Sequence, residues 1–289
     1  MTKRAVLFAA ANIAVLLVLT LVVQLTGIDQ LMSARGWNWW LLLVAAAVLG
    51  IGGAFVSLAL SKWMAKRTMG VHTIVIARNP QETWLVTTVR RQAQAAGIAM
   101  PEVGIFESPD INAFATGAQR NQALIAVSSS LLNVMSQREA EAVLGHEITH
   151  IANGDMVTLT LIQGVVNTFV IFLSRTLGGP IDSLFGRTAP RRGPCYFLIM
   201  TLLQIAFGFL ATMIVASFSR QREFRADAGG TKLASRQSMI AALERLQQRQ
   251  RVPLPDQMAA FGFAGGRISN LFRSHPPTTV RIATLRGTA

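Results

Sequence analysis

The most regular feature of the chain is a set of long apolar runs separated by polar stretches. Residues 5–26 and 39–60 contain no charged side chain, and each is long enough to supply the ~20 residues that a helix needs to cross a hydrocarbon core. Two more uncharged runs, residues 156–174 and 195–219, follow in the second half. The pattern predicts an integral membrane protein, mostly α-helical, with up to four transmembrane helices.

The third run is the least uniform of the four, because it carries Thr158, Gln163 and Asn167. If it crossed the membrane, a group of arginines would lie on the outer side, against the usual distribution of basic residues; these are Arg175, Arg187, Arg191 and Arg192. A full span and a partly embedded helix therefore both stay open for residues 156–174.

Basic residues around the first two runs predict the topology. Lys and Arg concentrate on the cytoplasmic side of short loops. On one side of the pair lie Lys3, Arg4, Lys62, Lys66 and Arg67, whereas Arg35 stands alone on the other. Both ends of this hairpin should face the cytoplasm, with residues 27–38 outside. A multi-pass protein of a bacterial inner membrane fits this distribution.

The stretch between the two pairs of runs has the composition of a soluble domain. An amphipathic helix is expected near residues 81–95. Three short runs with strand character, residues 103–107, 111–116 and 123–128, are separated by turn formers. They predict a small antiparallel sheet. A capping-box pattern from Ser136 to Glu139 then predicts the start of a helix just before Ala140.

Composition narrows the class of partner. The chain is 51% hydrophobic and 14% charged, with a formal net charge of +13, and a basic surface attracts polyanions of any kind. No zinc-knuckle, RNP or helix-turn-helix signature accompanies the charge, and the basic residues lie beside membrane segments. We therefore expect anionic lipid headgroups, and not nucleic acid, to be their partner. Cys195 is the only cysteine, so an intramolecular disulfide is excluded.

The helix predicted after Ser136 carries a candidate metal site. His146 and His150 are one turn apart and share a face, as two ligands of a tetrahedral zinc ion require. Glu147, between them in sequence, would lie beside the metal, where a base can take a proton from water. Two solvated histidines on a helix are the alternative, and a catalytic zinc still needs a third protein ligand.

A third ligand is available directly after the fourth apolar run. Glu223 and Asp227 are spaced by four residues, so their carboxylates share one helix face. Glu223 would complete a His₂Glu site, and Asp227 could accept a hydrogen bond from a ligand histidine and fix its tautomer. Pairing of these acids with Arg222 and Arg225 on a solvated helix is the simpler alternative. The chain has only 14 acidic residues, and three of them, Glu147, Glu223 and Asp227, fall in these two short helices with the spacing of a metal site. This coincidence favours a metallopeptidase.

Four motifs together resemble the HtpX family of membrane zinc metallopeptidases, which is related to the CAAX prenyl endopeptidases. The motifs are HEITH followed by NGD, REFRAD, the earlier NAFATG, and the late HPP that precedes Arg281 and Ile282. They occur in order over nearly the whole chain. The resemblance implies a cytoplasmic zincin-like metalloprotease domain that carries the small β-sheet.

The resemblance also implies a role for individual residues. It makes His146, His150 and Glu223 the ligands of one Zn²⁺ per chain and Glu147 the general base. His275 would stabilise the oxyanion. Asp227 would be the acid behind a ligand histidine, and Arg281 would order it. The segment beside the substrate would comprise Asn112, Ala113, Phe114 and Ala115, which suits an edge strand that pairs with an extended peptide.

The chain departs from the family pattern at Gly229 and Gly230, where alanine-like helix formers are usual. Because glycine weakens a helix interior, we expect the helix that carries Asp227 to end early.

These observations predict four consecutive parts: a transmembrane hairpin (residues 1–67), the first half of the catalytic domain (68–155), a second apolar hairpin (156–219) and the second half of the catalytic domain (220–289). The expected activity is zinc-dependent cleavage of misfolded or surplus membrane proteins at the cytoplasmic face, as part of quality control and the stress response. A CAAX-type processing protease and a zinc-dependent membrane adaptor that does not cut its clients are the alternatives.

Overall fold

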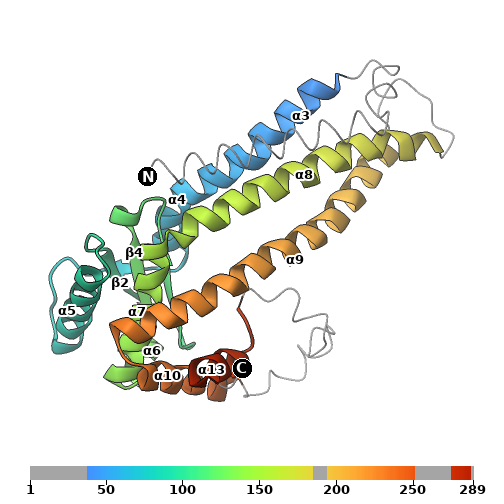
Figure 1. Ribbon diagram of the computed structural model, residues 1–289. Helices are drawn as coiled ribbons and strands as arrows, with labels where there is room; N and C mark the ends of the chain where they lie inside the picture. Colours follow the sequence, from blue (N-terminus) through green and yellow to red (C-terminus); the bar gives the residue numbers. More distant parts are fainter. Residues whose placement is uncertain (1–37, 185–193, 251–274, 288–289) are drawn as a thin grey trace. The chain divides into compact units, whose positions relative to one another are not determined.

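The computed structural model describes residues 38–184, 194–250 and 275–287 (Figure 1). The first predicted transmembrane run, residues 5–26, lies outside this part, as do most of the predicted outer loop and Arg187, Arg191 and Arg192. Within it the fold is mostly helical with one small sheet, as predicted. The contacts divide the chain into two compact units. Among the described residues, unit 1 comprises residues 38–56, 160–184 and 194–215, and unit 2 comprises residues 57–159, 216–250 and 275–287.

Three helical segments in the described part are long and apolar enough to cross a membrane: Trp39–Thr68, Asp155–Gly178 and Tyr196–Leu233. The first comprises α3 (Trp39–Ala47), the π-helical turn η1 (Val48–Gly52) and α4 (Gly53–Thr68). The other two belong to α8 (Asp155–Leu184) and α9 (Pro194–Leu233). The apolar run at residues 156–174 is therefore one continuous helix despite its polar side chains, and the chain is a membrane protein.

Within unit 1, α3 and η1 pack closely against α8. Trp39, Leu43 and Phe172 form a buried cluster. At Gly50 the backbones approach so closely that a Cβ atom would lie 2.5 Å from the Thr168 backbone nitrogen. Small residues permit this kind of approach between membrane helices, where dispersion contacts replace the hydrophobic effect as the driving force.

Unit 2 contains a four-stranded sheet of β1 (His72–Thr73), β2 (Glu102–Phe106), β3 (Ala113–Thr116) and β4 (Leu124–Ser128). Its order is β1-β2-β4-β3. The prediction of an antiparallel sheet was wrong, because β2 and β4 are parallel, with Glu102 opposite Leu124, while β1 and β3 are antiparallel to their neighbours.

Burial explains this topology. Every residue of β4 is buried, and a strand that is apolar on both faces is stable only in the middle of a covered sheet. After β2 the chain therefore forms β3 one strand position away from β2. It then returns and forms β4 in the position between them. The short helices η2 (Arg120–Gln122) and α6 (Ser129–Val134) flank β4 in sequence.

The helix α7 (Gln137–Asn153) begins where its sequence predicts. Ser136 and Glu139 form the capping box, and Gly154 ends the helix in the left-handed conformation, with φ 66°. One face is a buried apolar stripe of Ala140, Leu144, Ile148 and Ile151. This stripe lies in the core of unit 2 together with residues of α5 (Pro80–Ala95) and α10 (Arg236–Gln250). The predicted helix at 81–95 is confirmed as α5.

The expectation that the helix carrying Asp227 ends at Gly229 was wrong, since α9 continues to Leu233. A Cβ atom at Gly229 would lie 2.2 Å from Thr149 Cγ2, and one at Gly230 would lie 3.0 Å from the His146 backbone nitrogen. The two glycines therefore let α9 approach the backbone of α7 beside the histidines. The packing of the two helices outweighs the cost of about 1 kcal/mol for each glycine in a helix.

Candidate metal centre

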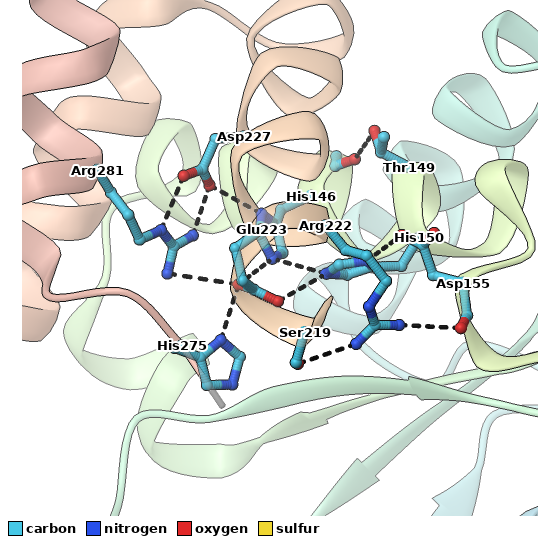
Figure 2. A network of polar contacts seen from close by, with 11 residues as sticks. His146, Thr149, His150, Asp155, Ser219, Arg222, Glu223, Asp227, His275 and Arg281 are labelled. Atoms are coloured by element: carbon cyan, nitrogen blue, oxygen red, sulfur yellow. Dashed lines mark hydrogen bonds and ion pairs between the residues drawn. The ribbon is translucent and has the colours of Figure 1, made fainter. Parts of the chain in front are cut away.

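Three segments of unit 2 meet at one buried site (Figure 2). The helix α7 carries His146, Glu147 and His150, and the last turns of α9 carry Glu223 and Asp227. His275 and Arg281 come from the segment that leads into and forms α13 (Thr278–Arg286). The structure thus brings together the residues that the sequence singles out near residues 146–150, 223–227 and 275–281.

The proposed ligand atoms have the spacing of a tetrahedral site. The Nε2 atoms of His146 and His150 are 3.1 Å apart. Glu223 Oε1 lies 3.4 Å from His150 Nε2, and Glu223 Oε2 lies 3.5 Å from His146 Nε2. Bonds of about 2.0–2.1 Å to a tetrahedral zinc ion place ligand atoms roughly 3.3–3.4 Å from one another. The three side chains, all buried, could therefore hold one metal ion without rearrangement.

Each histidine has its other ring nitrogen on a carboxylate. His146 Nδ1 lies 3.0 Å from Asp227 Oδ1, and His150 Nδ1 lies 2.7 Å from Asp155 Oδ2. A carboxylate at Nδ1 holds the proton there and leaves the Nε2 lone pair for a metal. In their neutral form, both histidines would therefore direct the Nε2 lone pair toward the point at which their Nε2 atoms converge.

Glu223 provides a further test of whether a cation fits. Its carboxylate is 2% exposed, and Oε2 makes no hydrogen bond of acceptable geometry, although His275 Nδ1 lies 2.7 Å away. Burial of a carboxylate oxygen without a hydrogen bond costs several kcal/mol unless positive charge is near. Arg281 Nη1, 3.7 Å from Oε2, supplies part of that charge, and a metal ion between the three ligand side chains would supply the rest. Two neutral imidazole nitrogens and one carboxylate oxygen form the donor set that Zn²⁺ accepts, so the residues present fit this metal.

Arg281 joins the two carboxylates of α9 (Figure 2). Its Nε donates to Asp227 Oδ2 at 2.7 Å, its Nη2 donates to Asp227 Oδ1, and Nη1 lies 3.7 Å from Glu223 Oε2. The planar guanidinium therefore fixes the plane of the Asp227 carboxylate, which in turn orients His146. His275 is different, because 63% of its side chain is exposed and it can reach a bound molecule.

Two further residues beside the site, Asp155 and Arg222, were not predicted to act there. Arg222 is buried, and it donates from Nη1 to the Asp155 carbonyl oxygen at 2.9 Å and from Nη2 to Ser219 Oγ at 3.1 Å. It thereby holds the residue whose carboxylate orients His150. The signal lay in the NGD turn, because the left-handed Gly154 brings the next residue back beside the last turn of α7.

Replacement of Arg222 by glutamine should weaken zinc binding by about 10- to 100-fold, the usual cost of losing a group that orients a ligand. Arg222→Lys keeps the charge but cannot bridge both oxygens, so its effect should be similar in direction and smaller. Arg225→Gln is the control, because Arg225 is exposed on the same helix. Zinc competition with a chromogenic chelator measures all three variants; equal affinity of Arg222→Gln and wild type would contradict the role.

Neighbouring carboxylates raise the pKa of both ligand histidines. Burial opposes the charged form, but the hydrogen bonds to Asp155 and Glu223 and the charge of Glu147 outweigh burial and raise the pKa of His150 from 6.5 to about 9. Burial is likewise outweighed at His146, where Asp227 and Glu223 raise the pKa. A metal ligand must be deprotonated, so below pH 9 zinc has to displace a proton.

We therefore expect the affinity for zinc to rise with pH up to about 9, the pKa of His150, and to level off above it. Each proton released contributes up to about tenfold per pH unit. Chelator competition at several pH values, corrected for the chelator's own titration, measures this dependence. An affinity that does not change with pH would show that the histidines are already neutral in the metal-free protein.

The strand β3 lies beside the helix that carries the histidines. It is an edge strand among those described, since β4 is its one neighbour in the sheet order. Asn112, directly before it, is exposed, and Ala113, Phe114 and Ala115 are half-buried. The segment that the resemblance to the HtpX family assigns to the substrate therefore lies at an accessible edge next to the helix that carries His146 and His150.

Comparisons with known proteins agree with this geometry. Residues 79–289 match the model of peptidase family M48. A "Protease HtpX homolog" of Thiobacillus denitrificans is 56% identical over 287 residues, which cover 98% of this chain and 99% of that protein. "Protease HtpX" of Stenotrophomonas maltophilia is 57% identical over 289 residues, which cover 99% of this chain and 98% of the relative.

A solved structure shares the fold. The crystal structure of S. mikatae Ste24p superposes with a TM-score of 0.60 at 17% identity, over 97% of this chain and 67% of that one. The family match covers most of the chain, and the HtpX relatives align with it almost from end to end. The chain belongs to peptidase family M48, and within that family to the HtpX membrane metalloproteases.

Proposed function

We propose that this protein is a zinc endopeptidase of the HExxH-plus-Glu type that cleaves misfolded or surplus membrane proteins at the cytoplasmic face of a bacterial inner membrane. The observation that carries the proposal is the continuity of α9. This helix contains the apolar segment that can cross a membrane and also carries Glu223 and Asp227. The cutting site is therefore built onto a membrane helix, close to where that helix leaves the bilayer.

The basic residues support the cytoplasmic orientation. Lys62, Lys66 and Arg67 follow the apolar part of α4 directly, and such residues are retained on the cytoplasmic side. The proposed organisation has transmembrane hairpins at residues 1–67 and 156–219 that alternate with the catalytic halves 68–155 and 220–289. Both halves then lie on the same side of the membrane.

The chemistry follows from the side chains around the ligands His146, His150 and Glu223. Zinc, when bound there, acts as a Lewis acid toward the scissile carbonyl and toward water. Glu147 takes the proton of the attacking water and later passes it to the leaving amine. His275, exposed beside Glu223, donates a hydrogen bond to the oxyanion. Arg281 and Asp227 keep the His146 ring in place.

The ladder of β3 predicts how a substrate would bind. Ser128 N donates to the Asn112 carbonyl oxygen at 2.8 Å, so Asn112 directs its backbone groups toward β4. Direction alternates along an antiparallel strand. Ala113 and Ala115 therefore direct N–H and C=O outward, where an extended peptide can pair with them. The small side chains at both positions leave room for such a strand, and the Asn112 side chain can contact it.

The test uses the full chain reconstituted in vesicles with one membrane protein in a folded form and in a destabilised variant. We expect zinc-dependent cleavage of the destabilised form and little cleavage of the folded form. Glu147→Gln should cut neither. In vesicles of known orientation, cleavage should require access to the cytoplasmic face.

Other outcomes would select the alternatives. Cleavage of a short prenylated C-terminal peptide, with both forms of the membrane protein left intact, would indicate a narrow processing protease of the CAAX type. Zinc-dependent binding of the destabilised protein without any cleavage would indicate an adaptor.

A further inference from the structure

Two adjacent apolar side chains in unit 2 are almost completely exposed. Val75 and Ile76 are 90% and 78% exposed, more than any other large apolar residue in the described part of the chain. They follow β1 and precede α5. An isolated exposed apolar residue needs no explanation, but an adjacent pair at the tip of a loop favours contact with another apolar phase.

The sheet register places this loop tip. His72 pairs with Ile105 and Thr73 with Gly104, and Ile74 N donates to the Val103 carbonyl oxygen at 2.8 Å. The chain then leaves the sheet. In this antiparallel register the position after Ile74 is opposite Glu102, so Val75 lies near the end of the sheet where β2 begins.

The Glu102 carboxylate forms ion pairs with two lysines of α4. Its carboxylate oxygens lie 2.7 Å from Lys62 Nζ and 2.6 Å from Lys66 Nζ, and Lys62 Nζ also donates to the Gln122 carbonyl oxygen at 3.1 Å. These contacts, all within unit 2, fix the start of β2 against the last turns of α4. The loop tip with Val75 is therefore close to the same turns.

The last turns of α4 have the composition of a membrane interface. The apolar run ends at Leu60, and the next seven residues extend the helix by only about 10 Å, comparable with a headgroup layer of roughly 5–8 Å. Trp63 is 63% exposed, and Arg67 is exposed as well. Trp, Lys and Arg concentrate at this depth.

We propose that these residues form a docking surface that rests on the leaflet from which α4 emerges, with Val75 and Ile76 inserted among the headgroups. The docking surface consists of Trp63, Arg67, Val75 and Ile76. The surface is basic, because the three positive charges of Lys62, Lys66 and Arg67 exceed the one negative charge of Glu102. Its partner is therefore anionic phospholipid.

Membrane lipid fits these observations better than a polypeptide does. The surface is continuous with a helix that already enters the bilayer, and it combines apolar tips with basic residues, as interfacial anchors do. Docking would also hold the sheet at a fixed height above the membrane. Because β4 and β3 follow β2 in that sheet, the height of the substrate strand would be set by this contact.

The test measures the depth of the loop in nanodiscs. The full chain with Cys195→Ser receives a fluorophore through Val75→Cys, and lipids with a nitroxide near the headgroup act as quenchers. The control is Asp110→Cys, because Asp110 is exposed and lies beyond the opposite end of β2. The measurement requires neither zinc nor activity, so it is independent of the proposed function.

We expect lipid quenching at position 75 to exceed that at position 110 by at least about twofold, since an inserted tip reaches the quencher. Quenching at position 75 should increase with phosphatidylglycerol content, and Arg67→Gln should reduce the increase. Equal lipid quenching at both positions would overturn the proposal. A label at position 75 that stays accessible to aqueous iodide until unfolded protein is added would also overturn it and would indicate a polypeptide-binding surface.

Discussion

Replacement of Glu147 by glutamine is expected to reduce peptide hydrolysis by about 10³-fold or more while zinc content stays near one ion per chain. Glutamine keeps the shape of the side chain but cannot accept the proton of the attacking water, and general base catalysis alone accounts for about 10²- to 10⁴-fold. Because Glu147 is not one of the three grouped ligand side chains, the metal should remain bound. Zinc content by atomic emission and cleavage of an unfolded protein are measured on the same sample.

The matched control is Glu141→Gln. Glu141 lies on the same helix, is also half-buried, and pairs with Arg91 away from the metal ligands. It should retain the wild-type rate. Near-normal cleavage by Glu147→Gln would refute the assignment of the general base, whereas loss of zinc from this variant would show that Glu147 supports the metal.

Replacement of Glu223 by glutamine should remove zinc at concentrations that saturate the wild type, with an affinity loss of more than about 100-fold. Loss of a group that only orients a ligand already lowers metal affinity by about 10- to 100-fold, and Glu223 supplies the single anionic donor of the site. The same carboxylate lies within 3.5 Å of His146, His150 and His275, so its replacement removes the negative charge that these three groups share. Equilibrium dialysis against buffered zinc measures the affinity.

Glu244→Gln serves as the control for Glu223→Gln, because Glu244 forms an exposed pair with Arg286 in the same unit. It should bind zinc as the wild type does. If Glu223→Gln kept zinc at full occupancy, the third ligand would have to be another residue, and Asp227 would be the first to examine because it lies on the same helix.

Local patterns in the sequence predicted most of the ligand set. The capping box at Ser136 and Glu139 predicted where α7 begins, and the spacing of His146 and His150 on that helix predicted that they share a face. These are relations within one or two helical turns, which backbone geometry alone determines. The meeting of α7 with Glu223 was expected from the spacing of the acidic residues after the fourth apolar run and from the resemblance to the HtpX family.

Relations between distant segments were harder to predict. The sheet was expected to be antiparallel because turn formers separate its short strands, yet the burial of β4 places this strand between β2 and β3. Gly229 and Gly230 were read as helix breakers, although their lack of a Cβ atom serves the contact with Thr149 and His146. Both errors arise because tertiary packing outweighs local propensity.

The roles of Asp155 and Arg222 could not be predicted from the sequence for a similar reason. Asp155 reaches His150 only because Gly154 reverses the chain, and Arg222 reaches the Asp155 carbonyl oxygen from a helix far along the sequence. In the sequence, Arg222 is adjacent to a ligand and resembles one more surface arginine of α9.

The central claim, that zinc held by His146, His150 and Glu223 drives proteolysis, is tested most directly by reconstitution of the wild-type enzyme. The full chain in detergent is stripped with a chelator and then titrated with Zn²⁺ while cleavage of an unfolded protein and bound zinc are both recorded. We predict no cleavage without metal and a linear rise that stops at one zinc ion per chain. Full activity in a sample shown to contain no metal would contradict the claim.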